Sequence, residues 1–379
     1  MKNIISIILF LCIQFAYNQK TRAQGCVAIR SMSCGVGGVN AGGVIQQSHS
    51  RWQFTTNYRH FRSFRHFRGD VEEHERIENK TEVINISHSV ELGAVFQATK
   101  QLFISANVPL LYNDRSSLYE HYGNSLDANP SQSRFHTSSM GIGDARFSAN
   151  IWLIDVDKHS KANVSLGAGV KLPTGNYKAV DEFHRLGAEK QDYTVLIPVD
   201  QSIQLGDGGF GYTFDVQGFA PLYPNGTLYF NGFYMFTPQN TNGVLRRPDR
   251  PASDPITASF TIADQYAGRI GINHQVNHRF GISLGGRLEG IPALDAIGKS
   301  EGFRRPGYIV SVEPGLVYFS NRFAATATVP VALYRNRVKS YSDLQDPTGK
   351  RHGDAAFADY VVNLSMSYFF GKRADKNIE

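Results

Sequence analysis

The chain has 379 residues and a formal net charge of +6, from 39 Lys and Arg against 33 Asp and Glu. Lys2, Lys20 and Arg22 precede Gln24 with no acidic residue among them, so the chain from Gln24 onward carries 36 minus 33, or +3, too little for the concentrated basic face of a nucleic-acid-binding protein. The 36 Gly, 18 Tyr and 25 Phe favour β-structure with many turns, and no linker divides the chain, so one β domain is expected.

The first segment has the order of a secretory signal peptide. Lys2 precedes an apolar stretch at residues 4–17, and Thr21, Arg22 and Ala23 follow it. A membrane-spanning helix needs about 20 apolar residues, and no stretch of the sequence reaches that length. The sequence therefore predicts a signal peptide at residues 1–23, export of the rest of the chain, and no transmembrane helix.

Residues 24–49 are rich in glycine and contain Cys26 and Cys34. Cys12 is lost with the signal peptide, and exported thiols usually pair, so a disulfide between Cys26 and Cys34 is predicted. Lipidation of Cys26 is the alternative, although the residue three positions upstream is not the large apolar residue of lipoprotein signals.

In separate segments between residues 50 and 371 apolar and polar residues alternate, which is the pattern of strands with one apolar and one polar face. In the last such segment Leu364, Met366 and Tyr368 share one face, whereas Asn363 and Ser365 share the other. About twelve strands are predicted, at residues 52–58, 84–96, 102–112, 145–153, 162–172, 212–222, 228–236, 266–276, 280–288, 308–318, 323–333 and 360–370.

The connections between these segments are alternately short and long. The short ones are residues 99–101, 155–161, 224–226, 277–278 and 320–322, and the long ones are 62–83, 113–143, 173–211, 237–265, 289–307 and 335–356. Transmembrane barrels have short periplasmic turns and long extracellular loops, and an open sheet edge in hydrocarbon would leave backbone groups unpaired. The sequence predicts an all-β fold, a closed antiparallel transmembrane β-barrel over residues 50–371 in a bacterial outer membrane, with a periplasmic tail at residues 372–379.

Four prolines fall inside the predicted strands, although proline cannot donate a ladder hydrogen bond. Pro221, Pro109 and Pro330 lie toward strand ends, where this loss is tolerated. Pro314 lies in mid-strand, so a β-bulge is expected there.

The alternation also assigns charged side chains to the interior. Arg or Lys facing lipid at the membrane midplane would cost roughly 2 to 4 kcal/mol, so inward placement is required whatever the function. Pairing among these charges and direct contact with a ligand are both compatible with the pattern. The predicted lumen-lining residues are Glu91, Asp144, Arg146, Lys171, Asp215, Arg269, Arg287 and Glu313.

Three glycine-containing motifs resemble a known family. Gly-Ile-Gly-Asp-Ala-Arg opens a strand at 141–146, Lys-Leu-Pro-Thr-Gly-Asn-Tyr closes the next at 171–177, and Gln-Leu-Gly-Asp-Gly-Gly follows at 204–209. Together with the strands around 107–110 and 312–316, they resemble the outer-membrane transporters labelled "MetA-pathway of phenol degradation", which are related to FadL-type fatty-acid channels. The resemblance covers most of the chain from residue 52 and implies uptake of small hydrophobic or aromatic compounds.

The chain departs from FadL-type channels in strand number, because these have fourteen strands and an N-terminal hatch inside the lumen. Residues 24–49 are a candidate hatch, and a flexible periplasmic leader is the alternative. FadL-type channels also open sideways at a kinked third strand. The resemblance implies a lateral opening beside Pro109, and a proline that ends the ladder at the rim is the alternative.

Catalytic and metal-binding readings are weaker. His136 and Ser138 show the His-x-Ser arrangement of outer-membrane phospholipase A, but the Asn-Gly continuation of that family is missing. Several potential metal ligands lie among arginines without zinc-motif spacing, and carboxylates interleaved with arginines usually pair with them, so no metal site is predicted. These residues are His60, His66, Glu72, Glu73 and His74.

The prediction is therefore an outer-membrane channel for passive uptake of small hydrophobic or aromatic compounds, without enzymatic activity or cofactor. A general pore or structural barrel without a specific ligand is the alternative, and a barrel lipase is a minor one. The expected partners are outer-membrane lipids and a small hydrophobic ligand, with no nucleic acid.

Overall fold

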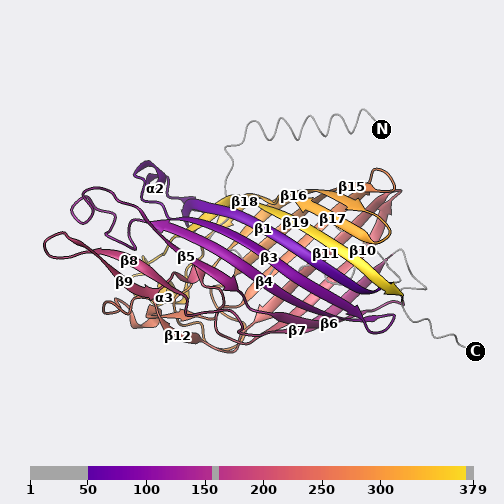
Figure 1. Ribbon diagram of the computed structural model, residues 1–379, viewed down its shortest axis with the longest axis horizontal. Coiled ribbons are helices and arrows are strands. Elements are labelled where there is room, and N and C mark those ends of the chain that lie inside the picture. Colours follow the sequence, from indigo (N-terminus) through magenta and orange to yellow (C-terminus); the bar gives the residue numbers. More distant parts are fainter. Residues whose placement is uncertain (1–49, 156–161, 373–379) are drawn as a thin grey trace, which may run out of the picture.

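The computed structural model describes residues 50–155 and 162–372, and these form a closed antiparallel barrel (Figure 1). Its first strand, β1 (Ser50–Arg68), pairs with the last, β19 (Ala355–Lys372), which closes the sheet. Closure leaves no row of unpaired backbone groups, and hydrocarbon would make such a row very costly. The signal peptide, Cys26, Cys34 and the candidate hatch at residues 24–49 lie outside the described residues.

Twelve positions around the wall are filled, as the alternation predicted. β5 and β6 share one position beside β4, and β17 and β18 share one between β16 and β19. The other wall strands are β3 (Ile84–Gln97), β4 (Leu102–Ser117), β5 (Phe135–Ile142), β6 (Arg146–Trp152), β7 (Asn163–Lys171), β10 (Gly211–Tyr223), β11 (Gly226–Phe236), β14 (Gln265–Gln275), β15 (Phe280–Ile291), β16 (Gly307–Phe319), β17 (Phe323–Thr328) and β18 (Val331–Asn336).

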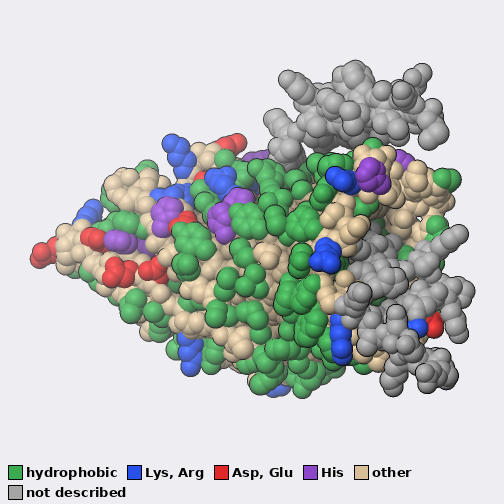
Figure 2. Space-filling model, turned by 45° about the vertical axis from the view of Figure 1, so that its right-hand side comes forward, with side chains coloured by type: hydrophobic (Ala, Val, Ile, Leu, Met, Phe, Trp, Pro, Cys, Tyr) green, Lys and Arg blue, Asp and Glu red, His purple; other side chains and the backbone are tan. Residues whose placement is uncertain are grey.

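The wall has an apolar outer face and a polar inner face. In β19, Leu364 and Met366 are 41% and 54% exposed, whereas Asn363 and Ser365 are buried, which confirms the predicted alternation. Figure 2 shows the apolar side chains as a broad zone over the barrel. This zone has the composition of a lipid-facing surface.

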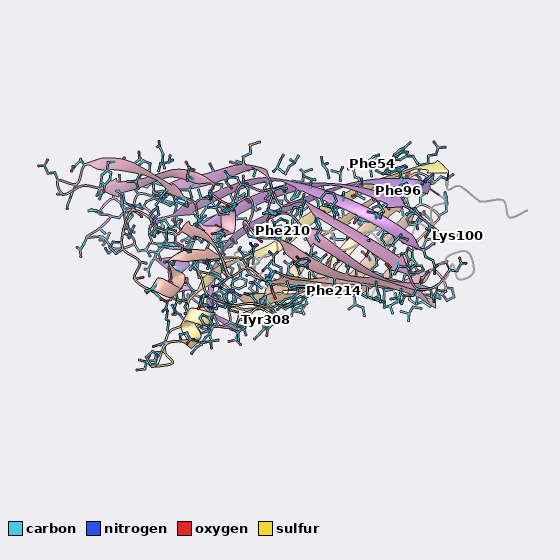
Figure 3. The ribbon with its side chains drawn as sticks, turned by 90° about the horizontal axis from the view of Figure 1, so that it is seen from below. Phe54, Phe96, Lys100, Phe210, Phe214 and Tyr308 are labelled. Atoms are coloured by element: carbon cyan, nitrogen blue, oxygen red, sulfur yellow. The ribbon has the colours of Figure 1, made fainter. Side chains whose placement is uncertain are left out.

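Aromatic side chains gather toward both edges of the apolar zone. At the end of the barrel where β1 begins, Trp52 packs on Phe96, with ring centroids 4.7 Å apart, and Phe54 and Phe96 lie together in Figure 3. Toward the other end Phe214 packs on Phe236, with centroids 6.0 Å apart. Paired aromatic girdles of this kind mark the two interfaces of a membrane barrel.

The two ends of the barrel differ in their connections. At the turn end, where β1 begins and β19 ends, the connections are short; at the loop end they are long (Figure 1). No helix in the described part of the chain is long and apolar enough to cross a membrane. The elements in the long connections are β2 (Val71–Glu72), α2 (Glu75–Glu78), β8 (Val180–Leu186), β9 (Asp192–Pro198), η1 (Gln201–Ile203), β12 (Thr241–Leu245), η2 (Pro255–Thr257), β13 (Ser259–Thr261) and α3 (Tyr341–Leu344).

Several strands run beyond their predicted ends toward the loop end. β1 continues to Arg68 rather than to residue 58, and β5 occupies part of the predicted loop 113–143. Outside the lipid zone the outer face need not be apolar, so the alternation stops while backbone pairing continues. The predicted limits of these long loops were therefore wrong.

The bulge predicted at Pro314 is absent from that position. β15 pairs with β16 in unbroken register through Leu284 and Pro314. The irregularity lies in the neighbouring position, where β17 and β18 are separated at Pro330, and Val329 N–H still donates to the Pro314 carbonyl over 3.1 Å. A missing donor in one strand is thus accommodated by a break in its neighbour.

Candidate functional site

A belt of buried charges crosses the inside of the barrel. Arg59 on β1 pairs with Glu289 on β15 over 3.1 Å, although these strands are not neighbours in the sheet, so the pair spans the lumen. Arg287 also pairs with Glu289, over 2.5 Å, and Arg269 pairs with Glu313 over 3.2 Å. Each of these five side chains is at most 6% exposed.

The belt continues on the opposite side of the lumen. Arg146 on β6 pairs with Asp215 on β10, and its guanidinium lies 5.0 Å from the ring centroid of Phe233. Glu91 accepts a hydrogen bond from Asn57 over 3.3 Å. The eight predicted lumen residues are therefore inside the barrel; six belong to this belt, and Asp144 and Lys171 belong to a second cluster described below.

Arg59 and Glu289 were missed by the sequence reading. Glu289 lies two residues after Arg287, on the same face of β15, but the predicted strand ended at residue 288. Continuing the alternation by one residue would have included it. Arg59 follows the predicted end of the first strand in the same way.

Two small cavities lie beside the belt among the described residues. A cavity of about 20 Å³ touches Glu91 and Arg146, and another of about 70 Å³ lies closer to the loop end. Toward the turn end the interior is packed by an aromatic and apolar cluster that includes Phe103, Trp152 and Tyr229. One water needs roughly 10–15 Å³, so these spaces hold a few waters and no larger solute in this conformation.

The wall is interrupted opposite Pro109. β4 pairs with β6 as far as Asn107, and it pairs with β5 from Leu110 onward. Residues 143–145 between these strands have no regular ladder, and Gly143 N–H donates to the Pro109 carbonyl over 2.8 Å. On its other side β4 pairs with β3 without a break.

Three side chains, here called the wall latch, lie at this interruption: Asp144, Lys171 and Asp207. The Lys171 ammonium lies 3.3 Å from the Asp144 carboxylate and also pairs with Asp207. Asp144 accepts backbone N–H groups from Gly175 over 3.0 Å and from Asp207 over 3.1 Å. The wall latch therefore joins the wall strands to two loop segments.

The wall latch brings together the three motifs on which the family resemblance rested. Thr174 closes the same junction, because its hydroxyl accepts Ala145 N–H and donates to the Gly143 carbonyl, each over 2.8 Å. Gly206 packs so closely that an added Cβ would lie 2.5 Å from Asp144 Oδ1. The glycines at this junction thus permit close approach of loop and wall.

The structure shows no hydrogen bond between His136 and Ser138, the two residues of the lipase alternative, among the described residues. Ser138 donates to Asp181 over 3.3 Å, while His136 Nδ1 lies 2.9 Å from Asp114. Within the described part of the chain no hydrogen bond joins Ser138 to His136, whereas a serine nucleophile needs its base within hydrogen-bond reach.

Potential metal ligands do meet at the loop end, in the group His66, Glu73 and Asp354. His66 Nδ1 lies 2.6 Å from Asp354, and its other ring nitrogen accepts Val83 N–H over 2.9 Å. Arg76 binds both Asp354 and Glu73. The candidate ligand atoms are thus engaged by protein donors and do not fit a metal ion.

The other potential ligands considered from the sequence lie elsewhere. His60 stacks on His88 with ring centroids 4.4 Å apart, and Glu72 pairs with Arg65. His74 lies 3.6 Å from Glu72. The five residues named from the sequence therefore do not form one site.

Three known structures are similar to this chain. An outer-membrane channel of Pseudomonas putida F1, described as COG4313, is 12% identical, with a TM-score of 0.53, over 85% of this chain and 96% of that one. The P. putida toluene transporter TodX is 10% identical, with a TM-score of 0.39, over 86% and 91% of the two chains. A FadL homologue of Pseudomonas aeruginosa is 8% identical, with a TM-score of 0.39, over 92% and 99%.

No family model and no curated protein matches the sequence, so the likeness to the phenol-degradation group stays a prediction, while the fold that it implied is confirmed. A closed barrel with an apolar outer zone between aromatic girdles requires lipid around its outer face. The chain therefore has the fold of a bacterial outer-membrane channel and the surface of an outer-membrane protein.

Proposed function

We propose that the protein is an outer-membrane channel for passive uptake of small hydrophobic or aromatic compounds, with a lateral opening beside Pro109. The observation that carries the proposal is the wall interruption at residues 143–145, which the wall latch closes. The cavity of about 20 Å³ at this place is lined by Pro109, Leu111, Leu205 and Met235 together with polar residues. Apolar side chains thus lie next to a gap in the ladder.

The charged belt disfavours a straight path for an apolar solute. Such a solute would have to displace buried ion pairs, and breaking one buried pair costs about 3 to 5 kcal/mol. Sideways exit at the interruption avoids the belt and releases the compound into lipid. Here the wall depends on the wall latch and on a few loop hydrogen bonds rather than on a continuous ladder.

Replacement of the latch lysine tests the lateral route. Lys171→Met removes the cation between Asp144 and Asp207, so we expect faster uptake of radiolabelled toluene by porin-deficient cells that express the variant. Lys299→Met, in an exposed loop position, is the matched control and should behave as the unchanged protein. Heat-modifiable migration on gels verifies that each variant folds.

Two results would contradict the proposal. The first is that cells expressing the unchanged protein take up no more toluene than cells without it. The second is that a folded Lys171→Met variant takes up toluene at the same rate as the unchanged protein. Swelling of liposomes in arabinose supplies a second readout, because a channel for apolar compounds should pass little sugar.

A general pore or a structural barrel is the second candidate, and the packing inside the described part of the barrel favours the structural barrel. Among the described residues, the two cavities next to the paired charges and the packed cluster around Phe103 have volumes of about 20 and 70 Å³. Sugar flux without toluene uptake would identify a general pore. The absence of both fluxes would identify a structural barrel.

A further inference from the structure

A cavity of about 580 Å³ opens at the loop end of the barrel. The connections after β1, β12, β15 and β18 contribute to its lining, as do α2 and the outer end of β4. Its volume falls in the range of small-molecule sites, roughly 300–1,000 Å³. It is therefore large enough for a ligand that the interior of the barrel does not admit in this conformation.

The lining is strongly cationic. Nine of its residues are Lys or Arg and two are Asp. Five further carboxylates pair with these cations without lining the cavity, so nine positive charges face seven negative ones. These further carboxylates are Glu73, Glu120, Asp200, Asp254 and Asp295.

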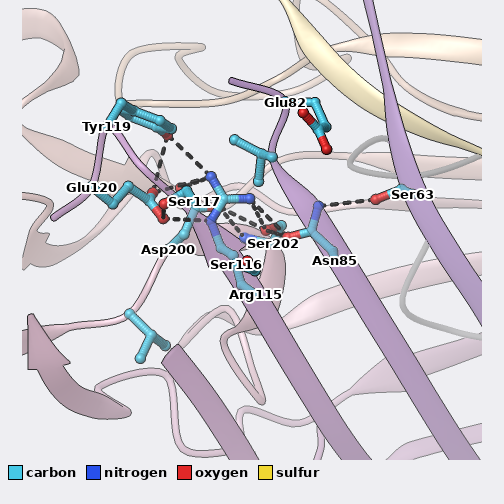
Figure 4. Close-up of polar contacts among 12 residues, drawn as sticks. Ser63, Glu82, Asn85, Arg115, Ser116, Ser117, Tyr119, Glu120, Asp200 and Ser202 are labelled. Carbon is cyan, nitrogen blue, oxygen red and sulfur yellow. Dashed lines mark hydrogen bonds and ion pairs between the residues drawn. The ribbon is translucent and has the colours of Figure 1, made fainter. Parts of the chain in front are cut away.

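Ion pairs and hydrogen bonds hold the arginines at the floor of the cavity, and Figure 4 shows those of Arg115. Arg115 is 1% exposed and donates to Glu120 over 2.8 and 3.0 Å and to Asn85 over 2.8 Å. Arg305 donates to both oxygens of Asp200, each over 2.8 Å. The carboxylates at the floor hold these two guanidiniums in place before any ligand arrives.

Arg246 differs from the arginines of the floor. In the described part of the chain no acidic side chain lies within ion-pair distance of it, and its guanidinium lies 3.5 Å from the ring centroid of Phe303. Arg305 lies over the same ring at 4.6 Å. Burial, the largest cause, and the charge of Arg305 lower the pKa of Arg246, and Tyr119 and Asp200 oppose this only in part, so its positive charge is incompletely compensated.

Burial and the charge of Arg305 also act on Arg337. Together they lower its pKa to about 10 despite the nearby Asp343. An anion bound between these arginines would restore the balance of charge. The cavity thus favours a further negative group, beyond the carboxylates of the described residues.

The side chains that line the cavity indicate which class of anion it would bind. A guanidinium presents parallel N–H donors that match the two oxygens of a carboxylate. Phe303, Tyr119 and Ala355 offer apolar and aromatic surface in the same cavity. We propose that this cavity is a binding site for small aromatic carboxylates, which would be collected here before passage.

The role of this cavity in uptake rests on the proposed channel function, but binding of a carboxylate to the cavity can be measured separately. The experiment is calorimetric titration of the detergent-solubilised full chain with benzoate and with its uncharged analogue benzamide. Benzoate should bind at least about tenfold more tightly, and added salt should weaken it, because ionic contacts are screened. Arg246→Gln should weaken benzoate binding about tenfold without changing that of benzamide.

Arg279→Gln is the matched control, since Arg279 is exposed at the turn end. Equal binding of benzoate and benzamide would overturn the inference, and so would an unchanged affinity in Arg246→Gln. Tighter binding of inorganic phosphate than of benzoate would overturn the aromatic class. Benzoate binding without toluene uptake would refute the channel proposal alone, and toluene uptake without benzoate binding would refute the site alone.

Discussion

His121 lies in an aromatic cluster at the loop end. Its ring centroid is 5.3 Å from those of Phe135 and Phe183, and its Nδ1 accepts the backbone N–H of His184 over 3.1 Å. Burial, the largest cause, lowers the pKa of His121 to about 4, against the opposing effect of Glu120. The neutral ring is therefore the form that the cluster stabilises.

Acid should loosen this cluster. The pKa of His121 is lower in the folded chain than in the unfolded one, so its contribution to stability is full above pH 6.5 and is lost as the pH falls toward 4. Protection of the His184 amide against hydrogen exchange should therefore fall between pH 6.5 and 4.5. His121→Gln keeps an acceptor that does not titrate and should show no such fall.

The control for this titration is His278→Gln, which alters an exposed histidine at the turn end. It should retain the fall in protection. Protection that does not depend on pH in the unchanged protein would show that protonation of His121 does not disturb the cluster.

The residues of the charged belt show what a sequence can predict at this scale. The alternation of residues along each strand placed Arg269, Arg287 and Glu313 inside the barrel, because hydrocarbon excludes unpaired charge from the outer face. It did not predict that Arg59 would cross the lumen to Glu289, because that contact depends on barrel diameter and strand tilt. Pairing partners across a lumen are set by closure, which no single strand encodes.

At the scale of elements, the sequence predicted the strands accurately only where their outer face is the apolar zone. Strands in the apolar zone were located from alternation, because each residue there faces either hydrocarbon or the interior. β8 and β9 belong to a long connection outside the wall and show no such pattern. The meeting of the segments around Gly143, Gly175 and Gly206 was also hidden, because it is loop packing between distant parts of the chain.

Gly206→Ala tests whether close loop packing closes the wall. The added Cβ would lie 2.5 Å from Asp144 Oδ1 and 2.7 Å from the Gly175 carbonyl oxygen, so the loop must move. The Gly175 and Asp207 amides, which donate to Asp144, should then exchange hydrogen about tenfold faster, as expected for the loss of one charge-assisted hydrogen bond.

Gly286→Ala is the control, because a Cβ there would meet nothing within 4 Å. Its exchange rates at the two amides should equal those of the unchanged protein. If Gly206→Ala gave the same rates as this control, the wall latch would not depend on the fit of the loop.

At the scale of the whole molecule, the barrel separates two polar environments. Its short turns lie at the end where β1 begins and β19 ends, and its cationic cavity lies with the long loops at the other end. In outer-membrane barrels the short turns face the periplasm. The cavity therefore faces the medium, which is the side from which an uptake channel receives its solute.

This orientation can be tested on intact cells. Ala188 lies in the connection between β8 and β9, at the far loop end in Figure 1, whereas His278 lies in the short turn between β14 and β15, and both are exposed. A membrane-impermeant maleimide should label Ala188→Cys on whole cells but His278→Cys only after the outer membrane is permeabilised. The unchanged protein measures background labelling of Cys26 and Cys34. Labelling of His278→Cys on intact cells, with Ala188→Cys protected, would reverse the orientation and place the cationic cavity in the periplasm, where it would receive solutes leaving the cell.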